Sequence, residues 1–94
     1  MNHPTAADAP QLTRQEVEQL ALEAVREVLG AVDASLDDDF FALGGQSLDA
    51  GKVIARLSRN TGVRASLADF FEEPTARQLA ALIVSAVREG SDAR

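Results

Sequence analysis

Apolar residues recur three or four positions apart in long stretches of the chain, and no stretch alternates strictly between apolar and polar residues. This spacing predicts amphipathic helices, because positions three and four apart lie on one face of a helix. The first helix is predicted to begin at Thr13, which forms a capping-box pattern with Glu16, and to end at Gly30. The second is predicted to begin at Ser47 and to end at Gly62.

A short helix, a last long helix and a long connection complete the predicted fold. Ser66 opens a capped segment that must be short, because Pro74 cannot continue a helix. A capping pattern at Thr75 opens the last helix, which Gly90 ends. Residues 31–46 show no sustained period, and a connection this long in a small domain usually has structure or a function of its own. The pattern predicts an all-α fold, a small four-helix bundle with a short third helix and a long loop between the first two helices.

Composition narrows the class of protein that this bundle can be. The chain has 94 residues, which suits one domain, predicted over 13–89 between a disordered lead-in at 1–12 and a tail at 90–94. A net charge of −6 argues against nucleic acid or an anionic membrane as a partner. The absence of cysteine removes disulfides and thiolate chemistry. Neither a secretory signal nor an apolar run of about 20 residues is present, so we expect a cytoplasmic protein.

The stretch Leu43–Leu48 is the candidate functional site. Its two glycines leave the backbone open, and Ser47 follows at the start of a predicted helix, so a hydroxyl is presented at a helix N-terminus. Catalysis by this serine is not expected, because the chain has no credible histidine base and lacks the last glycine of the G-x-S-x-G nucleophile motif. Ser47 is therefore either an ordinary helix cap or a substrate for another enzyme. Phe40 and Phe41 fix the loop before it, which favours the second interpretation.

Three consecutive aspartates at 37–39 precede the candidate site. A calcium loop would need spaced ligands and a distal Glu, and this run has neither. We therefore interpret the run as a solvated acidic loop, and no metal site is expected.

Two motifs in the chain resemble those of a known family. The first is the run Asp39–Leu48, with the sequence DFFALGGQSL, and the second is Phe70–Thr75, with the sequence FFEEPT. Together they resemble the peptidyl carrier proteins, or thiolation domains, of nonribosomal peptide synthesis, within the phosphopantetheine-binding acyl carrier protein-like family. The resemblance extends over about residues 14–88, and it implies the same four-helix fold that the hydrophobic pattern predicts.

The resemblance implies a specific role for the candidate site. Ser47 would receive 4′-phosphopantetheine from coenzyme A, transferred by a magnesium-dependent phosphopantetheinyl transferase. The flanking residues of the site would be Gly44, Gly45, Gln46 and Leu48. The thiol of the arm would then hold an aminoacyl or peptidyl group as a thioester, loaded by an adenylation enzyme and passed to condensation or tailoring enzymes. The chain would be a monomeric, non-catalytic shuttle in nonribosomal peptide or hybrid natural-product synthesis, such as antibiotic biosynthesis.

The residues around Ser47 favour a peptidyl carrier over an acyl carrier. Carriers for fatty acids and polyketides usually have Asp directly before the serine and an acidic second helix. This chain has Gln46 there, and its second helix carries Lys52, Arg56 and Arg59. An acyl carrier for polyketide or other acyl groups is the alternative. A helical interaction domain, in which the serine only caps a helix, is a third interpretation.

Six residues are candidate contacts for partner enzymes: Phe41, Asp49, Gly51, Lys52, Phe70 and Phe71. Gly51 departs from the family pattern and is unfavourable inside a helix by about 1 kcal/mol relative to Ala. It reflects either drift at an exposed position or an altered partner surface. Because the chain starts at Met1 and ends just past the last helix, we expect a free-standing carrier rather than a domain of a large synthetase.

Overall fold

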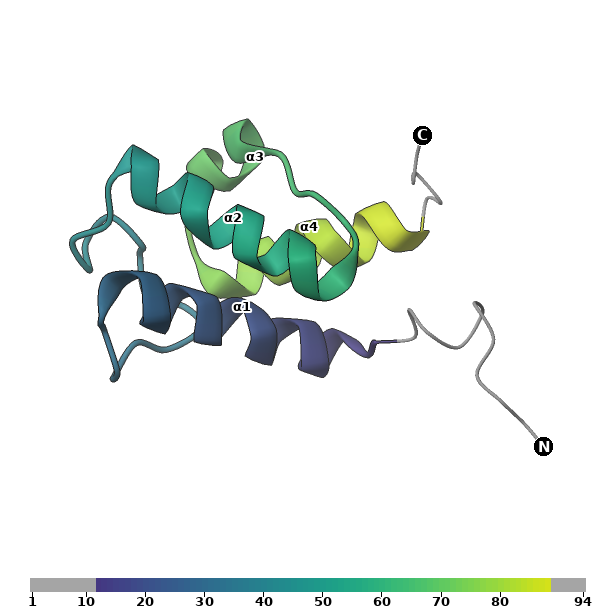
Figure 1. The fold of residues 1–94 in the computed structure, drawn as a ribbon, viewed down its shortest axis with the longest axis horizontal. Coiled ribbons are helices and arrows are strands. Elements are labelled where there is room, and N and C mark those ends of the chain that lie inside the picture. The colour runs from purple at the N-terminus through teal and green to yellow at the C-terminus, as the bar shows by residue number, and fades with distance from the viewer. Residues whose placement is uncertain (1–11, 89–94) are drawn as a thin grey trace.

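The structure, a computed structural model, describes residues 12–88, and that part of the chain contains four helices and no strand. The helices are α1 (Arg14–Leu29), α2 (Ser47–Thr61), α3 (Leu67–Glu72) and α4 (Ala76–Arg88). Figure 1 shows α1 and α2 running in opposite directions, with the short α3 at one edge of the bundle. The predicted all-α bundle with a short third helix and a long first loop is confirmed. The lead-in before residue 12, the stop at Gly90 and the tail at 90–94 lie outside the described residues.

Most helix ends follow the capping residues that the sequence predicts. The Thr13 hydroxyl accepts a hydrogen bond from the Glu16 amide (3.0 Å), and the Thr13 amide donates one to Glu16 Oε1 (2.8 Å). α1 and α2 end at Gly30 and Gly62, whose φ angles of 68° and 78° are left-handed. Ser66 caps α3 through its side-chain oxygen. These local signals therefore set two helix starts and two helix stops as predicted.

The capping pattern at Thr75 forms only by half. Thr75 Oγ1 accepts a hydrogen bond from the Gln78 amide (3.0 Å), as the pattern predicts. The Thr75 amide donates to the Glu73 carbonyl (2.8 Å) rather than to the Gln78 side chain. The backbone turn around Pro74 therefore uses the Thr75 amide, which would donate to the Gln78 side chain in a full capping box.

The core lies where the apolar faces of the helices meet. α1 packs against α2 and α4, and α3 packs against α2 and α4. No polar or charged side chain is buried within residues 12–88. None of the four helices in that range is long and apolar enough to cross a membrane. The largest fully buried side chains are Phe40, Val53, Leu57, Phe70, Leu79 and Ile83.

The long loop between α1 and α2 is fastened to the start of α4 by backbone hydrogen bonds. The amide of Phe40 donates to the carbonyl of Pro74 (2.7 Å). The amide of Arg77 donates to the carbonyl of Leu36 (3.0 Å). The loop therefore has a fixed structure without a helical period, as expected for a connection of this length.

Candidate functional site

Ser47 is the first residue of α2, and the N-cap is its neighbour Gln46. The interpretation of Ser47 as an ordinary helix cap is therefore wrong. Gln46 has the extended backbone of an N-cap (φ −123°, ψ 172°), and its carbonyl accepts the first helical hydrogen bond, from the Ala50 amide (3.0 Å). The Gln46 amide donates to Asp49 Oδ2 (3.0 Å). The Ser47 hydroxyl makes no hydrogen bond within residues 12–88, so it is not used to cap the helix.

The surroundings of the Ser47 hydroxyl are open and rich in donors. Ser47 is exposed, and Leu48 after it is 73% exposed. Their backbone amides have no hydrogen-bond acceptor in the part of the chain that the structure describes, as is usual in the first turn of a helix. The positive end of the helix dipole adds to these donors. A phosphate on the serine oxygen fits this position, because free amides at a helix N-terminus stabilise anions.

The two glycines before the site have structural roles that access to Ser47 does not explain. Gly44 has a φ of 100°, which side-chain-bearing residues rarely adopt. Gly45 is buried, and a Cβ added there would lie 2.6 Å from Cδ2 of the Phe40 ring. Gly45 thus allows the ring to pass directly beneath the loop. The sequence analysis attributed both glycines to an open backbone, and for the buried Gly45 packing is the better explanation.

Four phenylalanines form a continuous series from the core to the surface. The rings of Phe40 and Phe70 lie 5.5 Å apart in the core, and both side chains are at most 1% exposed. Phe41 contacts Phe40 edge to face at 5.3 Å and lies 5.7 Å from Phe71. Phe41 and Phe71 are 38% and 40% exposed. Phe70 is therefore a core residue, which corrects its prediction as a partner contact, whereas Phe41 and Phe71 stay accessible.

The aspartates of the loop are exposed or half-buried, as expected for a solvated run, and each also has a hydrogen-bond partner in the protein. Asp39 Oδ1 accepts hydrogen bonds from the amides of Phe41 (2.8 Å) and Ala42 (3.0 Å). Asp38 Oδ2 accepts one from the Ser35 amide (2.9 Å). Asp39 thus shapes the turn that leads to the site, a role that the sequence analysis missed. An aspartate that bonds amides two and three residues later is a local turn signal, and it was available in the sequence.

Two arginines hold the first half of the loop. Arg26 donates two hydrogen bonds to the Ala34 carbonyl, at 3.0 and 2.7 Å. Arg77 pairs with both carboxylate oxygens of Asp37, at 2.7 and 3.1 Å. The Arg77 hydrogen bond lowers the pKa of the Asp37 carboxyl below its ordinary value of 3.8, and the same bond raises the pKa of Arg77. Within residues 12–88, no group of three or more acidic, His or Cys residues is gathered for a metal ion.

The other predicted site residues lie along the first turns of α2. Asp49 is half-buried, where it accepts the Gln46 amide, and Lys52 is exposed. Gly51 has no positive φ, and a Cβ added there would meet no atom within 4 Å. Gly51 therefore has no steric reason to be glycine.

These features define a class of protein. The bundle presents one unbonded serine hydroxyl at the start of α2, on a loop fixed from beneath by aromatic packing and backbone bonds. No carboxylate, histidine or lysine bonds that hydroxyl within the described residues, as an activated nucleophile would require. The fold and the site therefore define a small helical domain with an exposed serine at the start of its second long helix.

Comparison with known proteins identifies the family. The family model described as "Phosphopantetheine attachment site" matches residues 19–83. A solved chain from the structure of the phosphopantetheine transferase Sfp in complex with coenzyme A and a peptidyl carrier protein superposes with a TM-score of 0.70 at 33% identity. That match covers 73% of this chain and 90% of the solved chain. The chain belongs to the phosphopantetheine-attachment family of carrier domains, and the predicted resemblance is confirmed.

The curated relatives are far longer than this chain. Cyclosporin synthetase simA of Tolypocladium inflatum is 46% identical over 70 residues, which is 74% of this chain and rounds to 0% of the relative. A dimodular nonribosomal peptide synthase of Bacillus subtilis (strain 168) is 38% identical over 68 residues, which is 72% of this chain and 3% of the relative. The chain thus corresponds to one thiolation domain within such synthetases.

Proposed function

We propose that Ser47 is the residue that receives phosphopantetheine, and that the chain carries aminoacyl or peptidyl groups in nonribosomal peptide synthesis. The observation that carries the assignment is the unbonded, exposed hydroxyl of Ser47 beside the free amides of Ser47 and Leu48. The other serines of the family match fit less well. Ser66 caps α3, and Ser58 is half-buried within α2. Ser35 is exposed, but it lies in the loop and not at a helix start.

The chain's own residues contribute position and electrostatics to the transfer. Ser47 Oγ forms a bond to the pantetheine-bearing phosphorus of coenzyme A, its proton passes to a base of the transferase, and the bond to the adenosine bisphosphate half breaks. The amides of Ser47 and Leu48 lie at the positive end of α2, where they stabilise the phosphodiester charge. When bound, the cofactor supplies a thiol that holds the cargo as a thioester.

The partners follow from this role. A phosphopantetheinyl transferase modifies Ser47, an adenylation enzyme loads the arm, and condensation or tailoring enzymes use the cargo. The structural neighbour comes from a complex of a carrier with such a transferase, which supports the first of these partners. The exposed rings of Phe41 and Phe71 and the Leu48 side chain provide apolar contact area near the serine. We further propose that the carrier acts as a monomer in the cytoplasm.

Intact-mass measurement tests the attachment residue. The chain is incubated with coenzyme A, magnesium and a broad-specificity transferase. The wild-type chain and Ser35→Ala are expected to gain the mass of one phosphopantetheine group, and Ser47→Ala is expected to gain none. An adduct that persists on Ser47→Ala, or one lost from Ser35→Ala, contradicts the assignment.

The type of cargo needs a second measurement. The similarity to nonribosomal peptide synthetases favours an aminoacyl group over the acyl groups of a polyketide carrier. The holo chain is therefore expected to accept an amino acid from an adenylation enzyme of a peptide synthetase. Loading by a malonyl-transferring acyltransferase, without loading by any adenylation enzyme tested, would support the acyl-carrier alternative.

A further inference from the structure

The residue that caps α2 is not the one that general capping preferences favour. Ser is among the residues most favoured at an N-cap, whereas Gln is not. The cap is nevertheless Gln46, and Ser47 is the first residue of the helix. A cap one residue later would use the Ser47 hydroxyl as the acceptor for the Ala50 amide, because a capping oxygen bonds an amide two or three residues on. The choice of Gln46 therefore decides whether the serine oxygen is free.

Backbone packing and bonds hold the loop before α2 as far as Gly45. The Gly45 amide donates to the Phe40 carbonyl (3.0 Å), and Gly45 itself is buried against the Phe40 ring. Gln46 is the next residue, and its amide donates to Asp49 Oδ2 (3.0 Å). Asp49 is half-buried in the first turn of α2. The Asp49 carboxylate is therefore the group that joins the extended cap to the helix that follows it.

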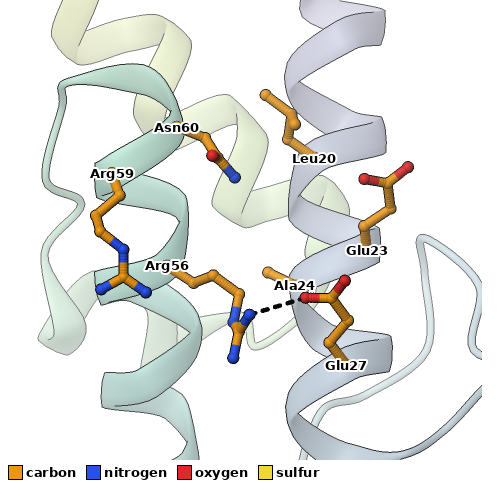
Figure 2. A pocket seen from close by; sticks show the side chains of 7 residues that line it. All are labelled: Leu20, Glu23, Ala24, Glu27, Arg56, Arg59 and Asn60. Carbon is orange, nitrogen blue, oxygen red and sulfur yellow. Dashed lines mark hydrogen bonds and ion pairs between the residues drawn. The ribbon is translucent and has the colours of Figure 1, made fainter.

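The body of α2 is held independently of this first turn. Val53 and Leu57 are fully buried in the core. Figure 2 shows the Arg56 side chain extending from α2 toward Glu27 of α1, beside a pocket between the two helices. Arg56 Nη1 and Glu27 Oε1 are 2.9 Å apart. A change of cap can therefore take place in the first turn while the rest of the helix keeps its position.

We propose that Asp49 is a positioning residue for arm attachment, because its bond to the Gln46 amide selects Gln46 as the cap and leaves the Ser47 hydroxyl free to react. The inference rests on the proposed function, in which Ser47 receives the arm. Without the Asp49 acceptor, the cap moves to Ser47, and the Ala50 amide moves from the Gln46 carbonyl to the Ser47 hydroxyl. That hydroxyl must then lose its bond before the oxygen can attack the phosphorus of coenzyme A.

Three variants at position 49 separate the hydrogen bond from the charge. Asp49→Asn keeps an acceptor oxygen without the charge, Asp49→Glu keeps both, and Asp49→Ala keeps neither. Asp49→Ala is expected to lower kcat for arm attachment about fivefold, which converts to about 1 kcal/mol, the usual strength of an N-cap bond. The KM for the carrier is expected to stay within about twofold, because the bond acts on the reacting oxygen and not on binding. Asp49→Asn and Asp49→Glu are expected to restore most of the lost kcat.

A different pattern would overturn the inference. If the transferase binds the Asp49 charge directly, Asp49→Ala and Asp49→Asn should both raise the KM for the carrier, and only Asp49→Glu should restore it.

Glu16→Ala is the matched control for Asp49→Ala. Glu16 occupies the same position in α1, where its Oε1 accepts the Thr13 amide at 2.8 Å. Because α1 and α2 run in opposite directions, the two helix starts lie at opposite ends of the bundle (Figure 1). Glu16→Ala thus removes the same kind of bond away from Ser47, and kcat is expected to stay at the wild-type value. A fivefold loss in this control as well would assign the effect to general destabilisation.

A double-mutant cycle detects the change of cap without any enzyme. Ser47→Ala in the wild-type chain should leave the thermal midpoint nearly unchanged, because the hydroxyl makes no hydrogen bond within residues 12–88. In the Asp49→Ala chain the same change should lower the midpoint by about 4–8 °C, since the hydroxyl has become the cap. The ¹³Cα resonance of Ser47 in Asp49→Ala should also move from its helical toward its extended position. Equal midpoint changes in the two chains would overturn the inference.

The wild-type chain in the attachment assay separates this inference from the proposed function. A wild-type chain that gains the arm, together with Asp49→Ala that gains it at the same kcat, removes the role of Asp49 and leaves Ser47 as the attachment residue. A wild-type chain that gains no arm removes the proposed function, and the role of Asp49 in attachment with it.

Discussion

The chain contains two Phe-Phe pairs, one in the loop before α2 and one in α3, and both divide in the same way. The first member of each pair, Phe40 or Phe70, is at most 1% exposed, and these two rings contact each other at 5.5 Å. The second member, Phe41 or Phe71, is more than a third exposed, and these two rings lie 5.7 Å apart. One pair comes from a loop and the other from a helix, so the division does not depend on secondary structure.

The difference between inner and outer rings separates stability from recognition. The inner rings pack the loop against α3 and so hold in place the loop that leads to Ser47. Phe41 packs edge to face on Phe40, and Phe41 and Phe71 together leave an exposed apolar surface, which we propose partner enzymes contact. Variants at the two kinds of position should therefore fail in different assays.

The largest expected effect is the loss of an inner ring. Phe70→Ala should lower the free energy of unfolding by about 3–5 kcal/mol, because a fully buried aromatic side chain leaves a cavity that the small core cannot fill. Phe71→Ala should cost about 1 kcal/mol, mainly from its contact with Phe41. Urea unfolding followed by circular dichroism measures both. If the two variants lost the same free energy of unfolding, the distinction between inner and outer rings would be contradicted.

The next effect concerns the glycine that admits an inner ring. Gly45→Ala should destabilise the domain by about 1–3 kcal/mol, because the new Cβ overlaps the Phe40 ring and the loop must shift. Arm attachment to Ser47 should also slow, since the shift displaces the start of α2. Thermal unfolding and the rate of mass gain with the transferase test the two parts. A variant with wild-type stability would show that the ring moves aside freely.

The matched control for that variant is Gly51→Ala, in which the same methyl group meets open space. This change should stabilise the domain by about 1 kcal/mol, because Gly is a poor residue inside a helix and its φ here suits any residue. Urea unfolding measures the gain. If Gly51 is part of an altered partner surface, loading by the adenylation enzyme should fall even though stability rises. Unchanged loading would favour drift at this position.

The smallest expected effect is at the outer edge of the loop, where Arg77 holds Asp37. The pKa of Asp37 is lowered in the folded state, so the pair stabilises the fold fully above the ordinary value of 3.8 and is lost as the pH falls through the lowered pKa. Asp37→Asn should therefore lower the thermal midpoint slightly at about pH 7 and flatten its fall below about pH 4. A variant curve parallel to that of the wild type would show that the exposed pair contributes nothing.

Local signals in the sequence predict nearly all of the secondary structure. Periodic apolar residues and caps such as Thr13, Gly30 and Gly62 act within a few residues, so their effects can be predicted without the fold. The predicted start of α2 at Ser47 is confirmed, but the sequence left open whether Ser47 itself caps the helix, because Gln46 and Ser47 can both stand at an N-cap. The backbone of the loop, which is fixed elsewhere in the fold as far as Gly45, and the bond from Gln46 to Asp49 decide between them.

The sequence predicts that Ser47 is presented at the start of α2, but it does not predict the packing that holds the loop before it. The motif around Ser47 indicates the hydroxyl, whereas the contact of Gly45 with the Phe40 ring depends on packing that no local pattern encodes. The burial of Phe70 was also missed. α3 has only six residues, and so short a helix gives too few turns for periodicity to choose between adjacent rings.

The two backbone bonds that fasten the loop to the start of α4 also set an order of assembly. Phe40 and Leu36 are synthesised well before their partners Pro74 and Arg77. During synthesis on a ribosome, the loop therefore cannot form these two hydrogen bonds until the start of α4 has emerged. A transferase that recognises the folded surroundings of Ser47 would act only after α4 has joined the domain, so the bonds that hold the serine in place would also delay its modification until this domain has folded.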